Sequence, residues 1–141
     1  MTHPAVLLID DDPILIEMYT TKFRLDGRIR LLTALTPGQG IEMASTEHPG
    51  LILLDLVMPK SDKRFGRLNE EVGFHVLETL KAHPKTKEIP VVIFTNLDER
   101  TKGYPELAKQ MGALDYWVKA HYQPNQVVDR VHRLLEQNAR G

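Results

Sequence analysis

The sequence predicts an α/β protein whose core is a doubly wound parallel sheet with helices on both faces. Five short apolar runs alternate along the chain with longer stretches of helical periodicity, as in repeated strand–helix units. The first, third and fourth runs are almost entirely apolar, which a strand needs when helices cover both of its faces. Polar residues close four of the runs, at the strand ends where open α/β sheets bind their ligands.

The five predicted strands are rich in β-branched and aliphatic residues and are bounded by Asp, Gly or Pro. They cover residues 5–9 (AVLLI), 30–35 (RLLTAL), 51–55 (LILLD), 91–95 (VVIFT) and 115–119 (DYWVK). Because helical stretches separate them, we expect parallel neighbours joined by right-handed crossovers.

Helices are predicted after each of these strands. Pro13 suits a first helical turn, and the helix that it opens should end before Asp26 and Gly27. Thr36 fits the N-cap of the second helix, which should end near His48. Pro105 is expected to open the fourth helix. The apolar positions that mark the last three helices are Phe74, Leu77 and Leu80; Leu107 and Met111; and Val127, Val128, Val131, Leu134 and Leu135.

Length and composition fit one soluble domain spanning residues 1–141. The net charge of -1 argues against a nucleic-acid-binding domain, which usually carries a basic excess. The absence of cysteine excludes disulfides, thiolate metal sites and cysteine nucleophiles. We see no signal peptide and no apolar run near the ~20 residues that span a bilayer, so a cytoplasmic protein with no membrane partner is expected.

Four separate strands deliver reactive side chains to one edge of the predicted sheet. Carboxylates ~4 Å apart repel one another by about 4 kcal/mol at an effective dielectric of ~20, so a cluster of them needs a cation. Mg²⁺ prefers one or two carboxylates, waters and phosphate oxygens, and a neighbouring carboxylate can act as a nucleophile. A hydroxyl and an ammonium can bind the oxygens of a transferred phosphoryl group. The residues in question are Asp10, Asp11 and Asp12 after the first strand, Asp55 in the third, Thr95 in the fourth and Lys119 in the fifth.

The stretches VLLIDDDP, LILLDLVMP, IPVVIFTN and GALDYWVKA follow one another between about Val6 and Leu135. In this order and spacing they resemble the receiver domain of two-component response regulators, in particular its single-domain, chemotaxis-regulator-like members. The resemblance implies a flavodoxin-like fold, a five-stranded parallel sheet with strand order 2-1-3-4-5.

The resemblance also assigns a metal site and a phosphoacceptor. Asp55 would be the residue that becomes phosphorylated. Asp10 and Asp11 would hold Mg²⁺, with Asp11 the more direct ligand, and Mn²⁺ could substitute. Asp55 and the backbone carbonyl of Val57 would complete the protein's share of the coordination.

Three further roles follow from the same resemblance. The Thr95 hydroxyl would bond to the phosphoryl group as the switch residue, and Lys119 would pair with a phosphoryl oxygen. Tyr116 would be the aromatic residue that turns inward when Thr95 moves. The partners implied are a sensor histidine kinase or histidine phosphotransfer protein as donor and a downstream protein target. The chemistry would be limited to self-phosphorylation and dephosphorylation at Asp55, so the protein would not be an enzyme; the oligomeric state stays open.

The sequence departs from the family pattern at three places. Ala120 follows Lys119 where the family usually has proline, so the Lys119–Ala120 bond should be trans, because a cis bond before a non-proline residue costs ~2.5–4 kcal/mol. Asn96 stands where the family favours a small residue. The connection at about residues 60–72 is long for a strand–helix loop and is either a solvated insertion or a docking element for a kinase.

Several of these residues also have plainer interpretations. Asp12 is better explained as the N-cap of the helix at Pro13 than as a third metal ligand. Tyr116 could be an ordinary core aromatic, and Trp117 should pack on the opposite face of the sheet because strand side chains alternate. His121 is expected in an exposed loop, and none of the histidines has metal-ligand spacing.

Two other functions compete with the receiver interpretation. Asp10 and Asp12 superficially match the acidic motif of haloacid-dehalogenase-like phosphatases, in which Asp10 would be the nucleophile. The usual residues after that motif are missing, and the chain leaves no room for a cap domain. A pseudo-receiver that serves as a binding scaffold without phosphorylation has only Ala120 in its favour.

Overall fold

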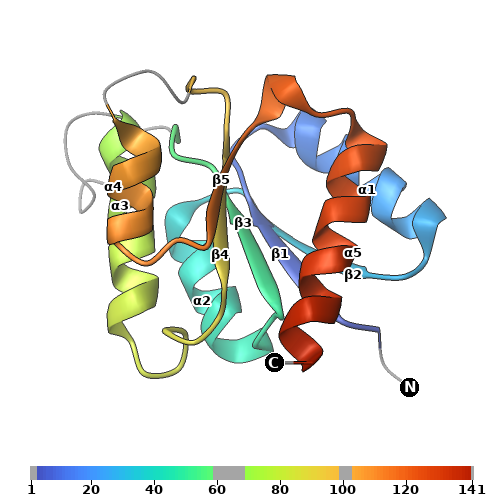
Figure 1. Cartoon of the computed structure of the whole chain (residues 1–141), viewed down its shortest axis with the longest axis horizontal. Coiled ribbons are helices and arrows are strands. Elements are labelled where there is room, and N and C mark those ends of the chain that lie inside the picture. The colour runs from blue at the N-terminus through green and yellow to red at the C-terminus, as the bar shows by residue number, and fades with distance from the viewer. Residues whose placement is uncertain (1–2, 59–68, 99–102, 141) are drawn as a thin grey trace.

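The protein is a three-layer α/β structure with one central sheet (Figure 1). The computed structural model describes residues 3–58, 69–98 and 103–140. The strands are β1 (Ala5–Ile9), β2 (Arg30–Ala34), β3 (Leu51–Leu54), β4 (Val91–Thr95) and β5 (Asp115–Val118). The helices are α1 (Pro13–Asp26), α2 (Pro37–Glu47), α3 (Asn69–Ala82), α4 (Tyr104–Gln110) and α5 (Pro124–Arg140), with a 3-10 turn, η2 (Lys119–His121), before α5.

The sheet has the strand order β2-β1-β3-β4-β5, and every neighbouring pair is parallel, as the sequence predicted. In this register Ile9 pairs with both Ala34 and Leu54, and Thr95 pairs with Val118. The last residues of β1, β3, β4 and β5 therefore lie along one edge of the sheet. This register brings the polar residues that follow the strands close together.

The two faces of the sheet pack against different helices. Helices α1 and α5 cover one face, and α2, α3 and α4 cover the other (Figure 1). Side chains alternate between the two cores, so Leu7 and Ile9 pack with α2 and α3 while Leu8 packs with α1 and α5. Tyr116 and Trp117 likewise enter opposite cores, which confirms the predicted orientation of Trp117.

Local sequence signals set the helix ends near the site. Asp12 caps α1, Pro13 occupies its first turn, and Gly27 ends it with a φ of 81°. Helix α2 begins after the N-cap Thr36 and ends at Glu47 with His48 as its C-cap, close to the predicted limits. In the part of the chain that the structure describes, no helix is both long enough and apolar enough to cross a membrane.

Helix α3 begins at Asn69, inside the connection predicted at about residues 60–72. The last part of that connection is therefore helical, and its residues 60–68 lie outside the described residues. Gly73 explains how α3 packs so close to the end of β3: a Cβ atom there would lie 2.3 Å from the Cα of Leu56. The Gly73 N–H also donates to the Leu56 carbonyl at 3.1 Å, which fixes the backbone just beyond Asp55.

Candidate functional site

Asp10 is placed by β1 and by the first turn beyond it. All five residues of β1 are buried, and the Asp10 N–H extends the pairing with β2 by donating to the Ala34 carbonyl at 3.0 Å. The Asp10 side chain is itself buried, and its Oδ1 accepts a hydrogen bond from the Asp12 N–H at 2.9 Å. Asp11 follows it at the surface, where it is half-buried.

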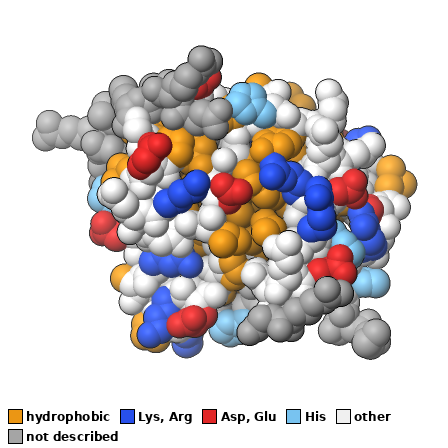
Figure 2. Space-filling model, viewed as in Figure 1, with side chains coloured by type: hydrophobic (Ala, Val, Ile, Leu, Met, Phe, Trp, Pro, Cys, Tyr) orange, Lys and Arg blue, Asp and Glu red, His pale blue; other side chains and the backbone are white. Residues whose placement is uncertain are grey.

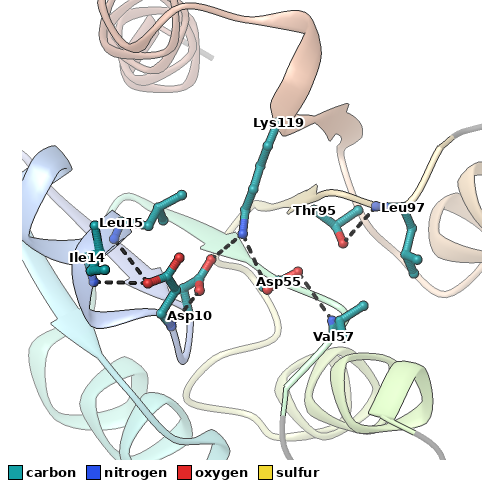
Figure 3. A network of polar contacts seen from close by, with 9 residues as sticks. Asp10, Ile14, Leu15, Asp55, Val57, Thr95, Leu97 and Lys119 are labelled. Atoms are coloured by element: carbon teal, nitrogen blue, oxygen red, sulfur yellow. Dashed lines mark hydrogen bonds and ion pairs between the residues drawn. The ribbon is translucent and has the colours of Figure 1, made fainter.

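Asp12 is bound to α1 rather than to the site. Its Oδ1 accepts hydrogen bonds from the N–H groups of Ile14 at 3.0 Å and Leu15 at 3.4 Å (Figure 3). These are two of the donors that a helix leaves unpaired at its N-terminus. The structure thus confirms the N-cap interpretation over a third metal ligand.

Asp55 follows β3 and lies beside Asp10. Its N–H donates to the Ile9 carbonyl at 3.0 Å, which holds the two strand ends together. The side chain is 7% exposed, and its Oδ1 accepts the Val57 N–H at 3.2 Å. Val57 therefore contacts the site through its backbone N–H, and the expected metal contact of its carbonyl stays a prediction.

Lys119 reaches the site from the far end of the sheet edge (Figure 3). It follows β5 as the first residue of η2, and its Nζ lies 2.6 Å from Asp10 Oδ2 and 3.4 Å from Asp55 Oδ2. The side chain is only 10% exposed, and its Nζ lies 5.7 Å from the centre of the Phe94 ring. The Lys119–Ala120 bond is trans, as expected.

Thr95 and Tyr116 are linked through the backbone of one residue that the sequence did not indicate. Thr95 is fully buried at the end of β4, and its Oγ1 accepts the Leu97 N–H at 3.4 Å. The Tyr116 hydroxyl donates to the Leu97 carbonyl at 3.0 Å. Leu97 contributes only main-chain atoms to these bonds, so no side-chain pattern could have pointed to it. Asn96, between the two, is exposed.

The charges of the site shift one another's pKa values. Burial raises the pKa of Asp55 to about 6, and the nearby Asp10 carboxylate adds to the rise against opposing effects of Lys119, Thr95 and Val57. Burial and Asp10 also raise the pKa of Asp11. Burial alone would lower the pKa of Lys119, but the carboxylates of Asp55 and Asp10 outweigh it, so the net shift is upward.

The carboxylates of this site fit a hard divalent cation. One oxygen from each of Asp10, Asp11 and Asp55 lies within 4.8 Å of the others, a spacing that lets a single ion bridge them. Carboxylate oxygens are the ligands that Mg²⁺ prefers, and half-buried Asp11 leaves room for waters in the remaining positions. The site thus combines a possible cation position, a nearly buried carboxylate and an ammonium within reach of both.

Comparisons with known proteins agree with this architecture. The model of the response regulator receiver domain family matches residues 6–132. PilH of Pseudomonas aeruginosa is 32% identical over 114 residues, which cover 81% of this chain and 84% of that protein. The DNA-binding dual master transcriptional regulator RpaA of Synechocystis is 29% identical over 140 residues, 97% of this chain and 51% of RpaA. The chain thus spans about half of RpaA and most of PilH.

Solved structures show the same fold. The Francisella response regulator 1452 receiver domain matches with a TM-score of 0.77 at 24% identity. The match covers 96% of this chain and 99% of that domain. A CheY-like receiver domain protein from Methanospirillum hungatei matches with a TM-score of 0.77 at 21% identity, over 99% of this chain and 100% of that one. With a family model that covers most of the chain, these relatives lead to one conclusion: the chain belongs to the response regulator receiver domain family of two-component signalling.

Proposed function

We propose that the protein accepts a phosphoryl group on Asp55 from a histidine kinase or histidine phosphotransfer protein, with Mg²⁺ or Mn²⁺ as cofactor. The observation that carries the proposal is the arrangement around Asp55. Its carboxylate is nearly buried, faces the Lys119 ammonium at 3.4 Å and shares its surroundings with Asp10 and Asp11. A nucleophile, a cation position and a charged donor for phosphoryl oxygens therefore lie in one place.

In the proposed transfer, a carboxylate oxygen of Asp55 attacks the phosphorus of the donor phosphohistidine. A P–O bond forms while the P–N bond breaks, and the electron pair of that bond leaves with the imidazole nitrogen. Mg²⁺, held by the carboxylates, would neutralise charge on the phosphoryl oxygens. Lys119 lies close enough to Asp55 to pair with one of these oxygens once it moves away from Asp10.

The signal would leave through a change in the surface beside β5. A phosphoryl group on Asp55 adds acceptor oxygens near Thr95, and the contacts of Thr95 and Tyr116 with Leu97 offer a route to the start of α4. Hydrophobic side chains gather between α4 and α5 with Lys and Arg on both sides (Figure 2). Leu107 and Leu114 are 40% and 46% exposed, which suits contact with a downstream protein.

Neither alternative function gains support from the site. A phosphatase would use Asp10 as the nucleophile, but Asp10 is fully buried and lies closer to the Lys119 ammonium, at 2.6 Å, than Asp55 does, at 3.4 Å. Asp12, the second residue of that motif, caps α1 instead. A scaffold without phosphorylation would have no use for the buried ion pair of Lys119 and Asp10, which is costly to bury. We therefore propose that the chemistry is confined to the protein's own Asp55, within one receiver domain spanning the chain.

The proposal is tested by incubating the protein with a small acyl phosphate and Mg²⁺. The wild type should gain a phosphoryl group that survives acid and is lost in base, as expected of an acyl phosphate, and Asp55→Asn should gain none. Labelling that persists in Asp55→Asn but disappears in Asp10→Asn would support the phosphatase instead. If neither the acyl phosphate nor phosphorylated donor proteins label the wild type, the result would support the scaffold without phosphorylation.

A further inference from the structure

The turn that carries Lys119 lacks the constraint that a proline after it would supply. Ala120 leaves φ free at that position, whereas a pyrrolidine ring would fix it. Within the turn, the hydrogen bond from the Tyr122 N–H to the Lys119 carbonyl is 3.3 Å long. Something else must hold these residues, because the Lys119 side chain extends from them to the carboxylates.

Three side chains next to the turn form a compact cluster. The guanidinium carbon of Arg130, on α5, lies 4.8 Å from the centre of the Tyr122 ring and 5.1 Å from that of Trp117. The two rings are 6.0 Å apart and tilted by 52°. Arg130 Nη1 also donates a hydrogen bond to the Tyr122 hydroxyl. We call Trp117, Tyr122 and Arg130 the aromatic–arginine clamp.

The clamp has a fixed base. Trp117 is 2% exposed within the α1–α5 core, and its Nε1 donates to Asp115 Oδ2 at 3.0 Å. Arg130 belongs to α5, which packs on the same face of the sheet. Tyr122 is therefore held between β5 and α5 by contact with a tilted indole and with a guanidinium over its ring, both favourable partners for a phenol ring.

The position of the clamp in the chain gives it a role beyond packing. Contact between the rings of Trp117 and Tyr122 closes the loop of residues 117–122, and Lys119 lies inside that closed loop. The two ends of the turn cannot shift independently while the clamp holds. The backbone of Lys119 is thus fixed in position, and from there its Nζ reaches to 2.6 Å from Asp10 Oδ2 and 3.4 Å from Asp55 Oδ2.

We propose that Arg130 is a positioning residue that acts through Tyr122 to hold the 119–121 turn and to aim the Lys119 ammonium at the Asp10–Asp55 site. As a contribution to the phosphoryl transfer, this role rests on the proposed function. The aim of Lys119 itself is a property of the protein alone, and it can be measured without any phosphoryl donor.

The first measurement is the rate of phosphorylation by a small acyl phosphate at saturating Mg²⁺. Arg130→Leu removes the stacked cation and the bond to Tyr122 and should slow the reaction about 10-fold, since small misplacements of a catalytic group are costly. Arg130→Lys keeps a cation over the rings without the planar fork and should recover part of the rate. Arg133→Leu, an exposed arginine on the same helix, removes the same charge and should leave the rate unchanged.

The second measurement asks whether Arg130 acts through Lys119. In a Lys119→Met background, Arg130→Leu should have no further effect on the remaining rate, because the group that it positions is gone. An equal slowing in both backgrounds would overturn the proposal, since Arg130 would then act on the fold at large. Tyr122→Phe keeps the ring and removes only the hydroxyl, so it gives a milder test if Arg130→Leu unfolds.

The third measurement is free of the transfer reaction. In the ¹⁵N-labelled wild type, the buried and hydrogen-bonded ammonium of Lys119 should give a slowly exchanging NMR signal that Lys119→Met removes. Arg130→Leu should broaden or abolish that signal, and Arg133→Leu should keep it. An unchanged signal in Arg130→Leu would refute the clamp even if Asp55 is phosphorylated. If Arg130→Leu loses the signal but the wild type never accepts a phosphoryl group, the role of the clamp would be supported and the proposed function refuted.

Discussion

Removing the charge of Asp55 should stabilise the metal-free protein at neutral pH. The Asp55 side chain is only 7% exposed and its carboxylate lies beside that of Asp10, so its ionised form is poorly solvated. An asparagine keeps the shape and the Oδ1 atom that accepts the Val57 N–H, and it carries no charge. The substitution Asp55→Asn therefore removes the cost of burying the ionised carboxylate while it keeps most of the contacts of the side chain.

The pKa of Asp55 gives the size and the pH range of this penalty. The carboxyl releases its proton near pH 3.8 in the unfolded chain and near pH 6 in the native protein. Between these values the native state holds the proton more tightly, so the free energy of unfolding falls as the pH rises from about 4 to about 6 and then levels off. A shift of this size corresponds to about 3 kcal/mol, with the attraction of Lys119 already included.

The assay is thermal unfolding of the wild type and Asp55→Asn in EDTA between pH 4 and pH 8. At pH 7.5 the variant should unfold about 10 °C higher, and the difference should vanish toward pH 4. Saturating Mg²⁺ should narrow the gap, because the cation offsets the wild-type charge. Glu17→Gln, which neutralises an exposed carboxylate, is the control and should change little. An Asp55→Asn variant no more stable than the wild type at pH 7.5 would show that the buried Asp55 charge does not destabilise the fold.

Three further predictions follow from the same geometry. Mg²⁺ should stabilise the wild type against heat, by about 2.7 kcal/mol at 100 times its Kd, and Asp11→Asn should lose most of this; equal responses of the two proteins would contradict the metal site. Gly73→Ala should destabilise the protein by about 1–3 kcal/mol or more in urea unfolding, because its Cβ would overlap the Leu56 backbone beside Asp55, and an unchanged midpoint would show that α3 shifts freely. Asp12→Ala should cost about 1 kcal/mol in the same assay by uncapping α1 while leaving Mg²⁺ affinity intact; a large loss of affinity would return Asp12 to the list of ligands.

The metal-free site shows how the chain tolerates its clustered aspartates. Lys119 neutralises part of their charge and is closer to Asp10, at 2.6 Å, than to Asp55, at 3.4 Å. If Asp55 is the phosphoacceptor, the ammonium must exchange partners during the reaction. A cation bound by Asp10 and Asp11 would favour this exchange, because it would take over the charge that Lys119 now balances.

Much of the fold could be predicted because the local signals agree with the tertiary structure. The apolar runs of β1, β3 and β4 are buried on both faces, as continuous apolar strands require. Asp12 and Thr36 cap the helices that the sequence placed after them. The start of α3 was missed, because residues 69–72 follow a polar stretch without an apolar stripe to mark a helix.

The site could be predicted residue by residue but not contact by contact. Strand ends located Asp10, Asp55, Thr95 and Lys119, since parallel strands bring their carboxyl ends to one edge. The pairing of Lys119 with Asp10 depends on side-chain reach across the sheet, which sequence spacing does not encode. The contacts of Leu97 involve only its backbone, and the clamp joins residues of β5, the following turn and α5 through their rings.

Asp55 is proposed here as the residue that accepts the phosphoryl group. The most direct test treats the protein with an acyl phosphate and Mg²⁺, reduces the product with borohydride and maps the peptides by mass spectrometry. Hydride converts an aspartyl phosphate to homoserine with release of phosphate, so the modified residue carries a permanent mark. We expect homoserine at position 55 alone, and its formation should depend on both the acyl phosphate and Mg²⁺. Homoserine at position 10, or none at position 55 in a protein that has taken up phosphate, would contradict it.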